Sequence, residues 1–510
     1  MTEGLPPLDT RPSTLTPPVS AAEAWLVGGA VAALAYPAWV RGGTYVPLQG
    51  PMLWLGAVPL AMLFLVPLAF RGERNAGATG AAQWRRLLGD PVFYLGLSFL
   101  ALLLVQWWNA GRTEALDAAG QRWIYGPPRH PHLPSAIARG EAAEMLHWFF
   151  PAWTLILTVR SGLLRFRAIR LLLLLVALNA GALALAGLRN YGTGAFASGP
   201  ETGFGGFASF GYPNHAAAFF SLTLLLALGL LLYELVGREE RPRRRGRIAL
   251  LGVAAALTLV GANLSLSRAG MLSWLAAFFV LVYGVGAAWP RLEAAARLHV
   301  VVVCVFAACV CFFVVDGFGK KALAAKAGKL IHLPLVEELA ERGFQARAAY
   351  RVWKEEPWFG VGGWGYRYLV GSHVEPEYRH RLGAGKANAH NDPLQFLAEF
   401  GLVGSGLLAA TVVTLLIPVA RRGVWSRPLV LFPLLGIGLT FTHSLIDLPF
   451  RCPAILWHWV TILAALPLAV ARQVDAQPQA ERPLRSLRSS VQIPEEPTPR
   501  TPLDAGRAQR

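Results

Sequence analysis

Residues 215–236 read HAAAFFSLTLLLALGLLLYELV, an almost unbroken apolar run. A helix needs about 20 such residues to cross the hydrocarbon layer of a membrane. The run is continuous rather than alternating between polar and apolar residues, so it is typical of a membrane helix and not of a β-barrel strand. We therefore expect a membrane-spanning helix here.

Comparable runs occur along most of the chain, and with this one they number about twelve. They are 22–40, 52–70, 91–109, 142–159, 170–187, 215–236, 248–265, 269–288, 299–316, 393–418, 428–446 and 452–471. The sequence predicts an all-α fold, a polytopic integral membrane bundle of about 12 transmembrane helices.

The composition supports this fold class. The 510 residues are 54% hydrophobic and only 15% charged, whereas soluble domains carry about 25% charged residues. These values exclude a chain of several soluble domains, a disordered chain and a collagen-like chain. The net charge of +17 comes from arginines in short loops between apolar runs. A nucleic-acid-binding protein would gather its basic residues on one folded polar surface, so we expect no nucleic-acid partner.

The arginines also predict orientation. Clusters such as REERPRRRGR at 238–247 follow even-numbered runs, whereas single arginines follow several odd-numbered runs. Cytoplasmic loops are rich in Lys and Arg, so both termini are expected in the cytoplasm. The predicted organisation is a disordered N-terminus (1–21), nine transmembrane helices (22–316), a large outward loop (317–392), three transmembrane helices (393–471) and a disordered tail (472–510).

Candidate site residues gather in and around that outward loop. LVEELAERGFQARAAYRVWKEEPW, at 335–358, has the spacing of an amphipathic helix. Next comes GKANAHNDPLQFLAEFGLVG (385–404), in which His390 and Asn391 either cap a helix or serve a site, and Glu399 follows. Arg268 lies between two apolar runs, where an interfacial role and a functional role are both open. His373, Glu375, Glu377 and His380 have no compact ligand spacing, so no metal site is expected.

Four of these segments resemble the O-antigen ligase and polymerase superfamily of bacterial membrane proteins. They are FASFGYPNHAAAFF (207–220), LSLSRAGML (264–272), RGFQARAAYRVWKEEPWFGVGGWGY (342–366) and AHNDPLQFLAEFGLVG (389–404). The resemblance covers roughly residues 200–420. Tyr212, Pro213 and Asn214 stand where the family commonly has Asn-Pro-Asn, and Asp392 and Pro393 follow the His-Asn pair.

The resemblance implies an inverting, metal-independent glycan transferase of the bacterial inner membrane that needs no cofactor. Its donor would be an undecaprenyl-pyrophosphate-linked glycan, and its acceptor a hydroxyl of a glycan or glycolipid on the outer side of the lipid bilayer. His390 matches the family's histidine and would act as the base, while Arg268 and Arg342 would grip the pyrophosphate, with Arg347 as a neighbouring substitute. Asn214, Asn391 and Glu399 would support the site.

Three enzyme types share this plan: ligation to a lipid A core, polymerisation of repeat units and transfer to a protein. The competing class is a membrane transporter for a small anion or a lipid-linked glycan, because twelve spans with both ends inside is also a transporter plan. A transporter is expected to show repeated halves and broken helices near the bilayer midplane. Neither is evident in the sequence, and the polar residues collect in one outward loop.

Overall fold

The computed structural model describes residues 19–69, 80–111, 113–116, 123–191, 206–236, 241–265, 267, 335–382, 387–421 and 427–475, with single positions at 282, 286, 289, 297 and 301. Within these residues, ten of the twelve predicted runs coincide with helices. The other two, 269–288 and 299–316, lie outside the described residues apart from single positions.

Seven described helices are long and apolar enough to cross a membrane: α1 (Ala21–Trp39), α4 (Pro91–Trp108), α6 (Phe166–Tyr191), α7 (Pro213–Val236), α8 (Arg241–Leu264), α14 (Asp392–Arg421) and α16 (Pro453–Asp475). Two further apolar helices are shorter in their apolar part, α2 (Gly50–Ala69) and α15 (Pro428–Ser444). The run at 142–159 forms α5 (Arg139–Leu157), which ends in a π-helical turn, η3 (Thr158–Gly162).

Short elements connect these helices. They are the single turns η1 (Arg41–Gly43) and η2 (Val46–Leu48), the short helix α3 (Gly80–Leu88), α12 (Leu335–Glu355), α13 (Tyr366–His373), and the turns η6 (Pro376–Arg381) and η7 (Pro449–Arg451). The all-α prediction is confirmed apart from one short hairpin, in which β1 (Thr113–Leu116) and β2 (Trp123–Tyr125) form an antiparallel pair. This hairpin lies between α4 and α5, where the sequence has no apolar run.

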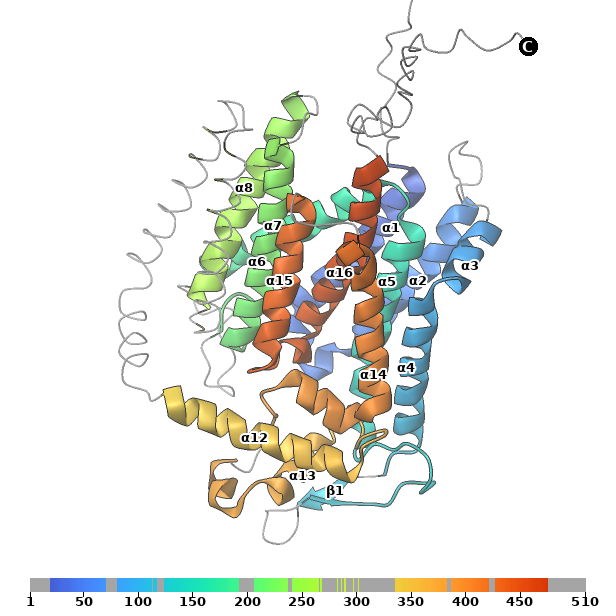
Figure 1. Ribbon diagram of the computed structural model, residues 1–510, viewed down its shortest axis with the longest axis vertical. Coiled ribbons are helices and arrows are strands. Elements are labelled where there is room, and N and C mark those ends of the chain that lie inside the picture. Colours follow the sequence, from blue (N-terminus) through green and yellow to red (C-terminus); the bar gives the residue numbers. More distant parts are fainter. Residues whose placement is uncertain are drawn as a thin grey trace, which may run out of the picture.

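The bundle has two distinct ends (Figure 1). α12 and α13 lie across one end, next to β1, while α3 lies toward the opposite end, where α16 finishes. α12 agrees with the helix expected at 335–358, and its Phe344, Ala348 and Val352 are fully buried. These side chains lie in a separate apolar cluster that includes Tyr366. The amphipathic face predicted from the spacing therefore attaches this layer to the bundle.

Arginines from two of the arginine-rich loops form ion pairs with helix ends. Arg165 lies 2.6 Å from Glu23 at the start of α1, and Arg247 lies 3.0 Å from Glu234 near the end of α7. Both carboxylates are almost completely buried. A buried carboxylate is costly unless it is paired, so each arginine stabilises the helix end at which its carboxylate partner lies.

α14 is two helices joined at a break. Gly401 has φ 63° and ψ −168°, a conformation open essentially only to glycine. The break removes the helical partners of the next two amides. Leu402 N instead donates to Pro357 O at 2.9 Å, and Val403 N donates to Trp358 O at 3.0 Å.

The glycine-rich segment after α12 also supplies hydrogen-bond donors to the carbonyl groups on the other side of the break. Ala398 O and Glu399 O, which lose their helical donors at the break, accept hydrogen bonds from Val361 N (3.0 Å) and Gly362 N (2.8 Å). Buried backbone groups must be paired, so the segment after α12 completes the hydrogen bonding of the broken helix α14. The first half of α14 is thereby fixed against α12 and α13.

Candidate functional site

His390 and Asn391 lie in the turn that enters α14. His390 has φ +47°, an uncommon conformation for a residue other than glycine. Asn391 accepts a hydrogen bond from Leu394 N at 3.0 Å, the geometry of a helix cap, and its Nδ2 donates to Leu445 O at 2.8 Å. Asn391 thus caps the helix as the local interpretation proposed, and it also joins α14 to the segment after α15.

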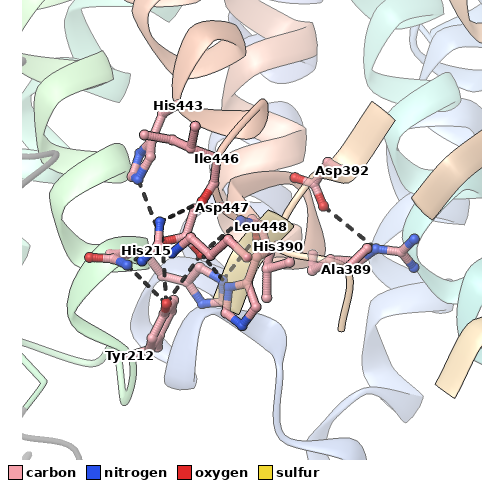
Figure 2. A network of polar contacts seen from close by, with 12 residues as sticks. Tyr212, His215, Ala389, His390, Asp392, His443, Ile446, Asp447 and Leu448 are labelled. Atoms are coloured by element: carbon pink, nitrogen blue, oxygen red, sulfur yellow. Dashed lines mark hydrogen bonds and ion pairs between the residues drawn. The ribbon is translucent and has the colours of Figure 1, made fainter. Parts of the chain in front are cut away.

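That segment carries Asp447, which is the centre of a polar cluster (Figure 2). Its side chain is only 1% exposed. Side chains from three other segments and from α15 surround the carboxylate: Tyr212, Asn214, Arg342, His390 and His443. A buried carboxylate requires such partners, so this cluster brings together regions that are far apart in the chain.

Two histidines flank Asp447. Nδ1 of His390 lies 3.6 Å from Oδ1, and Nε2 of His443 lies 3.8 Å from Oδ2. Burial alone would raise the pKa of Asp447, but the interactions with His390 and His443 hold it well below its usual range. The group is therefore an anion, able to orient an imidazole and to stabilise its protonated form.

Tyr212 and Asn214 hold the carboxylate from the start of α7. The Tyr212 hydroxyl donates to both oxygens of Asp447 at 3.2 Å and accepts from Asn214 Nδ2 at 2.8 Å. Asn214 Nδ2 also donates to Asp447, and its Oδ1 accepts from Ser267 Oγ at 2.5 Å. Burial and the nearby carboxylate raise the pKa of Tyr212, so the phenol stays a neutral donor.

The predicted arginines have different positions. Arg342 Nη1 lies 3.8 Å from Asp447 and donates to Ile446 O at 2.5 Å. Arg347 is 54% exposed and pairs with Glu375 at 3.2 Å, so its contact lies on the surface of the layer that α12 and α13 form. Arg268 lies outside the described residues, although its chain neighbour Ser267 contacts Asn214.

Glu399 is fully buried and lies 2.9 Å from Arg451 Nη2. The resemblance assigned Glu399 a supporting role, and in the structure this carboxylate pairs with Arg451. The structure therefore brings His390, Asn214 and Arg342 around one carboxylate and places Asn391 beside them, with Glu399 in a neighbouring buried cluster.

Two of the four residues considered for metal binding, His373 and Glu375, form ion pairs with other residues. His373 Nε2 lies 2.9 Å from Glu355, and Glu375 pairs with Arg347 and with Arg351. A hydrogen bond from its own backbone, together with these two arginines, holds the pKa of Glu375 below its usual range. Within the part of the chain that the structure describes, no group of three or more His, Cys, Asp or Glu residues is arranged to hold a metal ion.

Sequence reasoning missed Asp447, Tyr212 and His443. One signal was present: His443 and Asp447 are four residues apart in FTHSLIDLPF (441–450), at the end of an apolar run. Ionisable residues at such positions are costly and usually functional. That signal identifies His443 and Asp447 as candidates, but only the fold shows that Asp447 faces His390.

Comparison with known protein families gives one match. Residues 253–409 match the family described as O-Antigen ligase. The matched stretch contains Arg268, Arg342 and His390, and it supports membership of the chain in the O-antigen ligase superfamily. No curated protein matches the chain. The family and the apolar helices indicate a bacterial membrane protein with a glycan-processing function of the O-antigen ligase or polymerase type.

Proposed function

We propose that this member of the O-antigen ligase superfamily transfers a glycan from an undecaprenyl-pyrophosphate carrier to an acceptor hydroxyl on the outer side of the inner membrane. The observation that carries the proposal is the meeting of His390 and Arg342 at Asp447. One group suited to accept a proton and one suited to bind phosphate thus lie beside the same buried carboxylate.

His390 serves as the general base. Its Nδ1 faces Asp447, so Nε2 is the nitrogen that accepts the proton of the acceptor hydroxyl. The 3.6 Å separation from Asp447 is longer than a hydrogen bond, and catalytic contacts of this kind tighten when substrate binds. Asp447 stabilises the imidazolium that forms and holds the ring in one orientation.

The proposed step is a single displacement. The acceptor oxygen forms a bond to the anomeric carbon, the bond from that carbon to the pyrophosphate oxygen breaks, and the acceptor proton passes to His390. Undecaprenyl pyrophosphate leaves with the bonding electrons, and attack from the opposite face inverts the anomeric centre. His390 then releases its proton to water.

Arginine side chains receive the leaving group. A guanidinium is permanently charged and forms paired hydrogen bonds with phosphate oxygens. Arg342 fills this role at the Asp447 cluster, and Arg268 is assigned to it from the resemblance. Because these groups supply the positive charge, the proposed step uses no metal or other cofactor. Asn214 and Asn391 support it by holding Asp447 and the turn after α15.

The position of the cluster supports an outward site. Arg342 belongs to α12, which lies across the end of the bundle opposite to α3 (Figure 1). The arginine-rich loops predict that the α3 end faces the cytoplasm. Nucleotide sugars are scarce on the outer side, so a lipid-linked donor delivered through the bilayer fits the chemistry of this face.

The test is glycan transfer by purified protein in liposomes that contain an undecaprenyl-pyrophosphate-linked glycan and a candidate acceptor. Separate reactions offer a lipid A core glycolipid, a second repeat unit or an acceptor protein. We expect one acceptor to be glycosylated by the wild type and transfer to fall about 10²–10⁴-fold in His390→Ala. His373→Ala is the matched control, because this histidine pairs with Glu355 away from Asp447.

Two results would overturn the proposal. Full activity of a folded His390→Ala protein would remove the base. Uptake or flipping of labelled glycolipid without covalent transfer would favour the transporter class.

A further inference from the structure

A second buried charge cluster lies beside the Asp447 cluster. Arg451 is 3% exposed, and Asp392 and Glu399 are fully buried. Arg451 Nη2 lies 2.9 Å from Glu399 Oε2, and Arg451 Nε lies 3.6 Å from Asp392 Oδ1. The guanidinium also lies 4.6 Å from the ring centres of Trp364 and Phe396. These contacts fix the guanidinium on several sides.

The two carboxylates are tied to their surroundings as well. Glu399 Oε1 accepts a hydrogen bond from Gln395 Nε2 at 2.9 Å, and Asp392 Oδ2 accepts one from Phe450 N at 2.7 Å. Ionised groups removed from water are costly to bury, and replacement of such a cluster by apolar residues is often neutral or stabilising. Stability alone therefore gives little reason for this cluster, and a positioning role gives a better one.

The placement of the cluster in the chain indicates what it positions. Asp392 follows His390 by two residues at the start of α14, and Arg451 follows Asp447 by four residues in η7. The contact between His390 and Asp447 is thus flanked by two cross-links between the same segments. On one side Asn391 Nδ2 donates to Leu445 O, and on the other Asp392 binds Phe450 N and Arg451. Figure 2 shows Asp392 and its ion pair beside His390 and Asp447.

We propose that Arg451, with Asp392 and Glu399, is a positioning device that sets the separation and orientation of His390 relative to Asp447. The inference rests on the proposed function for its catalytic consequence. Arg451 does not act on the substrate itself. Its planar fork contacts two carboxylates on the first half of α14, so the segment that carries Asp447 cannot shift along that half-helix without breaking both ion pairs.

The kinetic test is a double-mutant cycle on glycan transfer. Arg451→Lys keeps the charge but loses the planar fork, and Glu399→Gln is an isosteric second variant. We expect each to lower kcat about 10- to 100-fold, since a shift of about 1 Å can cost 10²-fold, with little change in KM for the lipid donor. In an Asp447→Asn background the same substitutions should change kcat less than about threefold, because interacting sites are non-additive.

The second measurement needs no activity. Cysteines at Asn391 and Leu445, in a chain whose four native cysteines are replaced by alanine, report the proximity of the two segments through disulfide cross-linking. We expect efficient cross-linking in the otherwise unchanged chain and a several-fold slower rate with Arg451→Lys. Arg165→Lys, in the buried ion pair with Glu23 at another helix end, is the matched control and should leave the rate unchanged.

The outcomes separate the two proposals. Unchanged cross-linking with Arg451→Lys would overturn the positioning role. So would a double variant in which the loss of kcat equals the product of the losses caused by Arg451→Lys and by Asp447→Asn alone. If the wild-type protein transfers no glycan but Arg451→Lys still slows cross-linking, the positioning role is supported and the proposed function is overturned.

Discussion

Nδ1 of His390 lies 3.6 Å from Oδ1 of Asp447, whose carboxylate is almost completely buried. The imidazole comes from the turn before α14 and the carboxylate from the turn after α15, so the contact depends on where α14 begins and where α15 ends. A histidine held in this way by a buried anion is oriented and is able to take up a proton. The interaction gives His390 a physical basis for its proposed role.

Asp447→Asn keeps the shape of the side chain and removes its charge. We expect kcat for glycan transfer to fall about 10²–10⁴-fold, the range typical of general base catalysis, because the imidazolium loses its stabilising anion. The measurement is the transfer rate at saturating lipid donor, with the melting temperature as a folding check. Unchanged kcat in a folded Asp447→Asn protein would show that the carboxylate has no part in the reaction.

Tyr212→Phe removes the hydrogen bond that the neutral phenol donates to the same carboxylate. A hydrogen bond to a charged group contributes about 1.5–3 kcal/mol, so the loss of transfer should be about 100-fold at most and smaller than that of Asp447→Asn. Tyr350→Phe is a suitable control, because Tyr350 is 46% exposed on α12. An effect of Tyr212→Phe as large as that of Asp447→Asn would indicate that the phenol itself contacts substrate.

Arg342→Gln removes the guanidinium that lies beside Asp447 and Ile446 O. Since the proposed role is binding of pyrophosphate, we expect weaker binding of undecaprenyl pyrophosphate, by roughly tenfold or more for a lost charge-assisted hydrogen bond of about 1.5–3 kcal/mol. Arg347→Gln on the same helix should bind normally, because Arg347 contacts Glu375 at the surface. Equal loss in both variants would mean that net charge, and not the Arg342 site, attracts the lipid.

Gly401→Ala tests the break in α14. A Cβ at this position would lie 2.3 Å from the backbone of Trp358, and the φ/ψ combination costs a residue with a side chain about 1–3 kcal/mol even without a clash. We expect a clearly lower melting temperature in detergent. Gly406→Ala, on the same helix with open space around its Cβ position, should be neutral or slightly stabilising. Equal melting temperatures for the two variants would contradict the role given to the break.

Much of the membrane architecture could be predicted from residue order. The runs that became α7 and α16 are apolar over most of their length, and a chain segment in hydrocarbon must satisfy its own backbone hydrogen bonds. The apolar spacing of Phe344, Ala348 and Val352 likewise predicted α12. The break at Gly401 was not predicted, because it depends on hydrogen bonds from a loop that precedes it by about forty residues.

The candidate site could likewise be predicted only in part from the sequence. Local pattern identified His390 as a candidate, and the resemblance added Arg342 and gave both residues their roles. The resemblance also offered Arg347 as a substitute for Arg342, whereas the structure places Arg342, and not Arg347, beside Asp447. The Arg342 side chain is 21% exposed and that of Arg347, five residues further along the same helix, is 54% exposed. Which arginine faces the bundle depends on the packing of the helix.

The sequence by itself determined that this chain forms apolar membrane helices, which end carries the arginine clusters, and where its histidine and arginine candidates lie along the chain. Those properties follow from hydrophobicity and charge, which act locally and can be summed over a segment. Only the tertiary structure decided that Asp447 is the shared partner of His390 and Arg342, and that Arg451 pairs with Glu399. Such contacts join segments that lie far apart in the chain, so the periodicity of either segment does not reveal them. A buried charge must be paired, and the packing of the helices determines which oppositely charged residue lies close enough to pair with it.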